Sequence, residues 1–181
     1  MITLEPETDL EAAIMADARW QRGAEWGQPR RAHPEGRIDA HIGEVLANIE
    51  REQPGREERA KLRLIALLHD TFKSEVDHSK PSIGGNHHAS IARLFAERYV
   101  SDPDVLEIVE LHDEAYNSWR SGRRNGDWKR AEARAQRLLE RLGDRLPLFM
   151  AFYRADNASG DKDPEPMRWF DELAARSGTG S

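Results

Sequence analysis

The spacing of apolar residues is the feature that most constrains the fold of this chain. Apolar side chains recur every three or four residues through almost the whole sequence, and we find neither a convincing alternating strand nor an internal repeat. This spacing places apolar side chains along one face of a helix, and that face must be buried against other helices. We therefore expect an all-α protein.

Proline, glycine and capping residues divide this pattern into separate helices. Thr8 and Glu11 have the spacing of a capping box, and Asp102 followed by Pro103 is a cap with a first-turn proline. The expected helices run from Thr8 to between Trp20 and Trp26, from about Arg37 to Glu52, from about Arg56 to His69, from about Asn86 to Val100, from Asp102 toward Trp119, from Asp127 to about Leu142, over Leu146 to Tyr153, and from about Pro164 to Arg176. Residues 177–181 are expected to be a frayed tail.

Composition narrows the class of protein further. With 181 residues, of which 38% are hydrophobic, the chain has the size of one domain with a single core, and we expect residues 1–181 to form it. A formal net charge of −6 gives no overall basic field, so we expect neither a large nucleic-acid surface nor binding to an anionic membrane. The absence of cysteine, of a signal peptide and of a long apolar run predicts a cytoplasmic protein.

Several histidines and aspartates lie on the apolar faces of the expected helices. His41 lies on a stripe with Ile38 and Val45, and His69 follows Ile65 and Ala66. Helical spacing places further inward-facing polar residues in the same way, and the full set is His41, His69, Asp70, His87, His112 and Asp156.

Each of these residues alone has an ordinary interpretation, as a core histidine bonded to a backbone carbonyl or as a buried carboxylate that holds an arginine. All of them together would bury several polar groups in one small core, at roughly 1–3 kcal/mol for each group left unpaired. A shared metal ion removes that cost. Imidazole and carboxylate donors without sulfur suit one or two divalent transition-metal ions, namely Fe, Mn, Co, Ni or Zn.

The order of these residues resembles a known family. His41, then His69-Asp70, then Asp156, with Lys73 completing a His-Asp-x-x-Lys motif, is similar to the HD superfamily of metal-dependent phosphohydrolases. The resemblance spans about residues 33–160, including a His33-Pro34-Glu35-Gly36 segment similar to HD domains attached to tRNA nucleotidyltransferases. It implies a single-domain helical bundle with a central metal site. The sequence alone leaves the oligomeric state open, with a homodimer as one option.

The family implies a role for each matching residue. A first ion would be held by His41, His69, Asp70 and Asp156, and a second ion, present in some members, would take Asp70 as a bridge together with His87 and His112. The sequence leaves open which of the adjacent residues His87 and His88 is the ligand, because His88 also has apolar neighbours at helical spacing. We prefer His87. Phe72 stands where many members have glycine, which puts the turn after the ligands in doubt.

The expected chemistry is hydrolysis of a phosphate ester, with Asp70 orienting the attacking water while it binds metal, and Lys73 stabilising the phosphoryl group. The alternative for Lys73 is a solvated surface position. The substrate would be a small phosphorylated molecule, with nucleotides among the candidates. Two other functions remain open, an HD-type di-iron oxygenase with the same ligands and a metal-binding helical domain without catalytic activity.

Two other features remain ambiguous. The segment from Trp119 to Arg130 interleaves basic residues with Trp119 and Trp128, which fits either a substrate lid or a solvated loop and helix start. His33 and His78 lie in expected loops and are interpreted as surface residues, with the mouth of the site as the alternative for His33.

Overall fold

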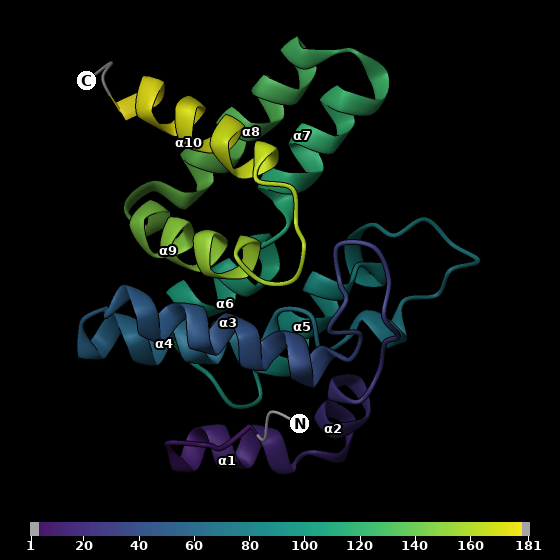
Figure 1. The fold of residues 1–181 in the computed structure, drawn as a ribbon, viewed down its shortest axis with the longest axis vertical. Coiled ribbons are helices and arrows are strands. Elements are labelled where there is room, and N and C mark those ends of the chain that lie inside the picture. Colours follow the sequence, from purple (N-terminus) through teal and green to yellow (C-terminus); the bar gives the residue numbers. More distant parts are fainter. Residues whose placement is uncertain (1–3, 179–181) are drawn as a thin grey trace.

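A computed structural model describes residues 4–178 and confirms the all-α prediction (Figure 1). Within these residues the backbone forms helices, with one isolated β-bridge between Arg30 and His33 and no strand. The helices are α1 (Asp9–Ala16), α2 (Ala18–Ala24), α3 (Ile38–Glu52), α4 (Arg56–Leu68), α5 (His88–Ala96), α6 (Pro103–Leu111), α7 (Glu114–Asn125), α8 (Trp128–Leu142), α9 (Leu146–Asn157) and α10 (Glu165–Gly178). Short 3-10 turns follow α4, precede α5 and precede α9.

Helix α4 lies at the centre of the arrangement. It packs against α3, α6 and α9, with a smaller contact to α5, and α1 and α2 lie below this layer in Figure 1. Helices α7 and α8 form an antiparallel hairpin that extends from the other end of the molecule, with α10 packed beside it. No helix among residues 4–178 combines the length and apolar content needed to cross a bilayer.

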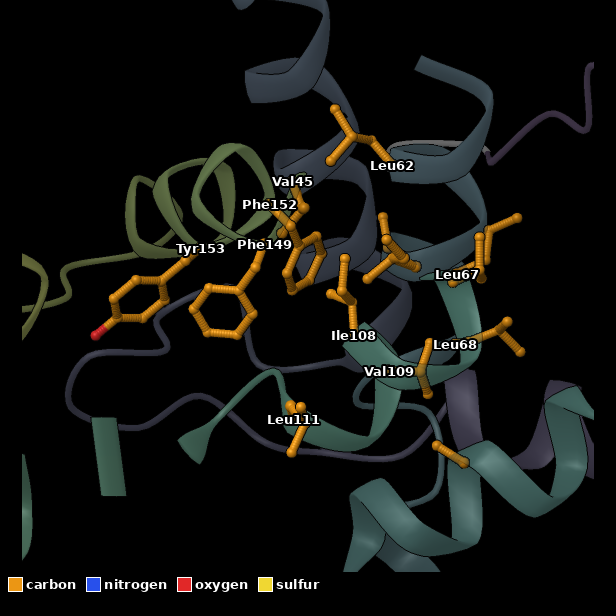
Figure 2. Packing of buried hydrophobic residues seen from close by; sticks show 14 of the residues in the cluster. Val45, Leu62, Leu67, Leu68, Ile108, Val109, Leu111, Phe149, Phe152 and Tyr153 are labelled. Carbon is orange, nitrogen blue, oxygen red and sulfur yellow. The ribbon is translucent and has the colours of Figure 1, made fainter. Parts of the chain in front are cut away.

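The buried apolar core lies next to the polar cluster at the ends of the central helices. Figure 2 shows Val45 of α3, Leu62 of α4, Ile108 of α6 and Phe152 of α9 turned toward a common interior. All four side chains are buried, as the apolar stripes in the sequence predict. The Phe152 ring also meets the ring of His69 edge to face, with 5.1 Å between centroids. The apolar interior therefore forms one wall of the polar cluster described below.

Two expected helices are each divided in two. The first breaks at Asp17, whose extended backbone starts a new helix and whose carboxylate accepts a hydrogen bond from Arg19 N. The second breaks at His112 and Asp113, between α6 and α7. At the C-terminus the helix continues to Gly178, so Ser177 and Gly178 belong to α10 rather than to a frayed tail. The remainder of that predicted tail, residues 179–181, lies outside the described residues.

Candidate metal centre

The candidate ligands lie at or near the ends of five helices. His41 is in the first turn of α3, and His69 and Asp70 follow directly after α4. His88 begins α5, His112 follows α6, and Asp156 is in the last turn of α9. Helix packing brings these ends together, so residues that are far apart in the sequence form one buried cluster.

Backbone hydrogen bonds orient two of the histidine rings. The Nδ1 atoms of His69 and His112 lie 3.0 Å from Ala66 O and 2.8 Å from Val109 O. A carbonyl oxygen can only accept, so Nδ1 carries the proton and the Nε2 atom of each ring is directed into the cluster. Such a bond to the second ring nitrogen is the usual support of a histidine that binds metal.

A third ring is held by side chains. His41 Nδ1 lies 3.2 Å from Ser159 Oγ and 3.4 Å from Glu35 Oε1. The Glu35 carboxylate is almost fully buried and also accepts from His33 Nδ1 at 2.9 Å. These contacts place the proton on His41 Nδ1 and turn His41 Nε2 toward His69 and Asp156. The two rings held by carbonyls have the same arrangement of proton and lone pair.

The first group of donors surrounds a point between α3, α4 and α9. His41 Nε2 lies 3.1 Å from both His69 Nε2 and Asp156 Oδ1, and His69 Nε2 lies 3.5 Å from Asp70 Oδ2. Donor atoms that share a metal ion at about 2.1 Å lie roughly 3 to 3.5 Å from one another. The spacing of this group therefore fits a transition-metal ion.

A second group of donors lies on the opposite side of the Asp70 carboxylate. Asp70 Oδ1 lies 3.3 Å from His112 Nε2 and 3.5 Å from His88 Nε2, and the two Nε2 atoms are 3.2 Å apart. The two oxygens of Asp70 thus face different pairs of histidines. A carboxylate in this position is able to bridge two ions.

The protonation states of His69, Asp70 and Asp156 agree with metal ligation. Burial lowers the pKa of His69 to about 4, so this ring is neutral at pH 7. Burial alone would raise the pKa of Asp70, but the Lys73 ammonium and the neighbouring imidazoles hold it well below its usual range. The pKa of Asp156 is likewise held low against burial, by Lys162 and His41. Ionised carboxylates and neutral imidazole are the forms that bind metal.

Facing pairs of Nε2 atoms also require a positive charge between them. Two lone pairs about 3 Å apart repel unless a proton or a cation lies between them. For His41 and His112 burial lowers the pKa, but the nearby carboxylates outweigh it and raise the pKa, so both rings lie where a positive charge is favoured. A metal ion meets it at both pairs without the burial of several separate protonated rings. The donor set therefore fits one or two divalent ions.

The structure brings His88, and not the preferred His87, beside Asp70 and His112. His87 has an extended backbone, and its Nδ1 accepts from Ala89 N at the start of α5. As a helical residue His87 would share a face with Leu94, seven residues further on, but Leu94 is 62% exposed. His88 begins the helix and is in register with the buried Ala92. His87 Nε2 instead lies 3.4 Å from Asp113 Oδ2.

Sequence reasoning missed three residues at the site. Glu35 and Ser159 contact His41, and Lys162 Nζ lies 2.7 Å from Asp156 Oδ1. Glu35 carried a signal, because it belongs to the segment that resembles other HD domains. Lys162 lies in a loop with no helical pattern, and nothing in its neighbourhood marks it. His33, interpreted as a surface residue, is half-buried beside Glu35.

A cavity of about 560 Å³ opens from the cluster. It is lined by candidate ligands of both groups, by Tyr116 and Tyr153, and by four cationic side chains, Arg30, Lys73, Arg120 and Lys162. The Lys73 ammonium contacts Asp70 Oδ2 directly. The hydroxyl of Tyr153 is buried and has no hydrogen-bond partner among the described residues. The cavity therefore combines metal-type ligands with groups that attract an anion.

Fold and site together define an all-α protein with a buried histidine and aspartate cluster at the meeting point of helix ends. The sequence matches the model of the HD domain over residues 38–148, which is more than half of the chain. The chain therefore belongs to the HD domain family, as the motif predicted. The match includes His41, His69, Asp70, His88 and His112 and ends before Asp156, which joins the cluster through the packing of α9. No curated protein and no solved structure gives a significant match.

Proposed function

We propose that this protein is a metal-dependent phosphohydrolase that acts on a small phosphate ester. In this proposal His41, His69, Asp70 and Asp156 hold a first ion, and Asp70, His88 and His112 hold a second. The observation that carries the proposal is the position of Asp70, whose two carboxylate oxygens face separate pairs of histidines. Membership of the HD domain family supports the same reading.

Bound ions would supply Lewis acidity toward water and toward phosphate oxygens. The protein's own residues then have distinct tasks. Asp70 is ionised and lies between the two groups, so it would orient the attacking water by accepting its hydrogen bond. Lys73 cannot ligate a cation, because an ammonium group has no lone pair, and besides its contact with Asp70 it has two further N–H groups that could donate to a phosphate oxygen.

The lining of the cavity supports a phosphate ester over an uncharged substrate. Besides Lys73, the ammonium of Lys162 and the guanidinium groups of Arg30 and Arg120 border the same space. Four aspartates, Asp70, Asp113, Asp156 and Asp163, balance these cations in the lining, and the overall charge is −6, so bound metal ions would supply the excess positive charge that recruits an anion. A volume of about 560 Å³ is that of a site for a small molecule, with nucleotides among the candidates.

Phosphate release under strictly anaerobic conditions tests the proposal. The protein would be purified without chelator, analysed for metal, and assayed with p-nitrophenyl phosphate and a panel of nucleotides and sugar phosphates. Hydrolysis without oxygen, lost on chelation and restored by added metal, is the expected result. Turnover that requires both iron and oxygen would identify a di-iron oxygenase instead. Bound metal with no turnover of any kind would favour a metal-binding domain without catalytic activity.

A further inference from the structure

The basic segment from Trp119 to Arg130 is not a loop. Helix α7 continues to Asn125, Gly126 ends it in the left-handed conformation, and α8 begins at Trp128. Figure 1 shows the two helices side by side, as a hairpin at the far end of the molecule from α1. The arginines of this region therefore lie on helices, and the position of each one along its helix determines the face from which its side chain projects.

One face of the hairpin borders a second and larger cavity. This cleft has a volume of about 910 Å³ and lies between the hairpin, the end of α6 and the segment from Ser82 to Ser90. It has His88, Asp113, Asn117 and Arg120 in common with the cavity at the metal centre. Because four residues line both spaces, the cleft adjoins the site at which phosphate would be hydrolysed.

Five arginines line the cleft, Arg120 and Arg124 from α7 and Arg134, Arg137 and Arg141 from α8. Two of them are neutralised within the protein. Arg134 forms a two-pronged ion pair with Glu114, at 2.5 and 2.7 Å, and Arg141 contacts Glu107 and Glu110. Among residues 4–178, no carboxylate forms an ion pair with the other three, Arg120, Arg124 and Arg137.

This placement of charge opposes the stability of the hairpin. Arg120 and Arg124, neither of which is neutralised by an ion pair within the described part of the chain, are one turn apart on α7. Like charges at this spacing destabilise a helix. A face that keeps such repulsion, and that lines a cleft with three exposed arginines free of ion pairs to other described residues, is suited to an anionic ligand. The planar fork of guanidinium matches phosphate in particular.

We propose that this cleft, which we call the arginine cleft, binds a second phosphate group of the substrate. The inference rests on the proposed function and narrows it to small molecules with two separated phosphates. One phosphate ester is hydrolysed at the metal centre while the other is held by Arg124 and Arg137. Arg120 lines both spaces, so it is in a position to contact either group.

The test compares two double variants that lose the same charge. Arg124→Ala/Arg137→Ala removes two unpaired arginines of the cleft, whereas Arg123→Ala/Arg130→Ala removes two exposed arginines of the same hairpin that do not line it. Each variant is assayed with adenosine 3′,5′-bisphosphate, with adenosine 5′-monophosphate and with p-nitrophenyl phosphate. The wild type should favour the bisphosphate by about tenfold or more in kcat/KM.

The cleft variant should lose that preference through a higher KM and retain its turnover of p-nitrophenyl phosphate, while the matched control keeps the preference. Equal loss in both variants, or no loss in either, would overturn the proposal. Calorimetric titration with the same bisphosphate separates this question from catalysis. If no ester is hydrolysed, the proposed function fails, yet weaker binding in the cleft variant alone still supports the cleft. Unchanged binding in that variant overturns it.

Discussion

The two halves of the histidine cluster share Asp70 but differ in how they are built. His41 and His69 have almost no exposed side-chain surface, at 2% and 1%, and both rings are fixed through Nδ1 by groups that belong to the core or its border. In the other half, His88 is 11% exposed and lines both cavities. Both histidines of the first half, which we call the enclosed half, are thus covered by packing, whereas His88 of the other half and the 18% exposed Asp156 border the space in which substrate would lie.

This difference predicts different behaviour for the two proposed ions. The enclosed half combines two fixed imidazoles with two carboxylates, and it would hold its ion more tightly because little ordering is needed on binding. The half at the cavities has only the shared carboxylate besides its histidines. We expect that ion to exchange more readily, and the predictions below separate the two halves in order of decreasing effect.

The largest effect is expected when the shared ligand is removed. Asp70→Ala takes one carboxylate oxygen from each half, so it should abolish metal binding and phosphate ester turnover together. Elemental analysis and phosphate release would measure both. Asp163→Ala is the matched control, because Asp163 lines the same cavity but belongs to no candidate metal group among the described residues. Full metal content in the Asp70 variant would refute the bridging role.

The next prediction separates the halves. His88→Ala or His112→Ala should remove the second ion and leave the first, with a loss of turnover on the order of 10³-fold if both ions stabilise charge in the transition state. His87→Ala should leave the metal content unchanged, since its Nε2 faces Asp113. Metal stoichiometry distinguishes the variants directly. A loss of metal from the His87 variant would restore the original preference for that residue.

Removal of the Lys73 ammonium should lower the turnover of a phosphate ester without changing the metal content of either half. Lys73→Ala is expected to lower turnover of a phosphate ester about 10²-fold, because one charge-assisted contact to the phosphoryl group is lost. Metal content should not fall, since an ammonium group is no ligand. Lys80→Ala, in the same loop but 70% exposed, provides the control. Normal turnover in the Lys73 variant would show that this lysine does not act on the phosphoryl group and would weaken the hydrolase proposal.

The smallest effect concerns the support of the enclosed half. Glu35→Ala removes a carboxylate that contacts His41 Nδ1, so the affinity for the first ion should fall about tenfold while the second is unaffected. Competition with a chelator of known affinity would measure this change. Glu35→Gln keeps an oxygen acceptor and should recover part of the affinity. An equal loss at both ions would show that Glu35 supports the fold and not one ring.

Much of this architecture follows from helical periodicity. The stripes that contain His41 and His69 are strong because α3 and α4 lie side by side and each buries one apolar face. The breaks at Asp17 and Asp113 could not be seen, because apolar spacing continues through both. The choice between His87 and His88 depended on the first residue of α5, and helix ends are the least predictable part of such a pattern.

Contacts that depend on tertiary packing could not be predicted from the sequence. Ser159 lies 118 residues from His41, and Lys162 reaches Asp156 from a loop after α9. The first contact depends on where the end of α9 lies against α3, and the second depends on the conformation of a loop that no helical pattern encodes. Asp156 itself was found through motif order, although the family match ends before it.

The α7–α8 hairpin lines the arginine cleft but contributes none of the candidate metal ligands. Its arginines can therefore change during divergence without a change in the coordination of the ions. Among descendants of one ancestral gene, substitutions at Arg124 or Arg137 would alter which molecules the proposed enzyme accepts while the candidate metal centre is inherited intact. A library of variants restricted to this face of the hairpin would be an economical route to new substrate preferences.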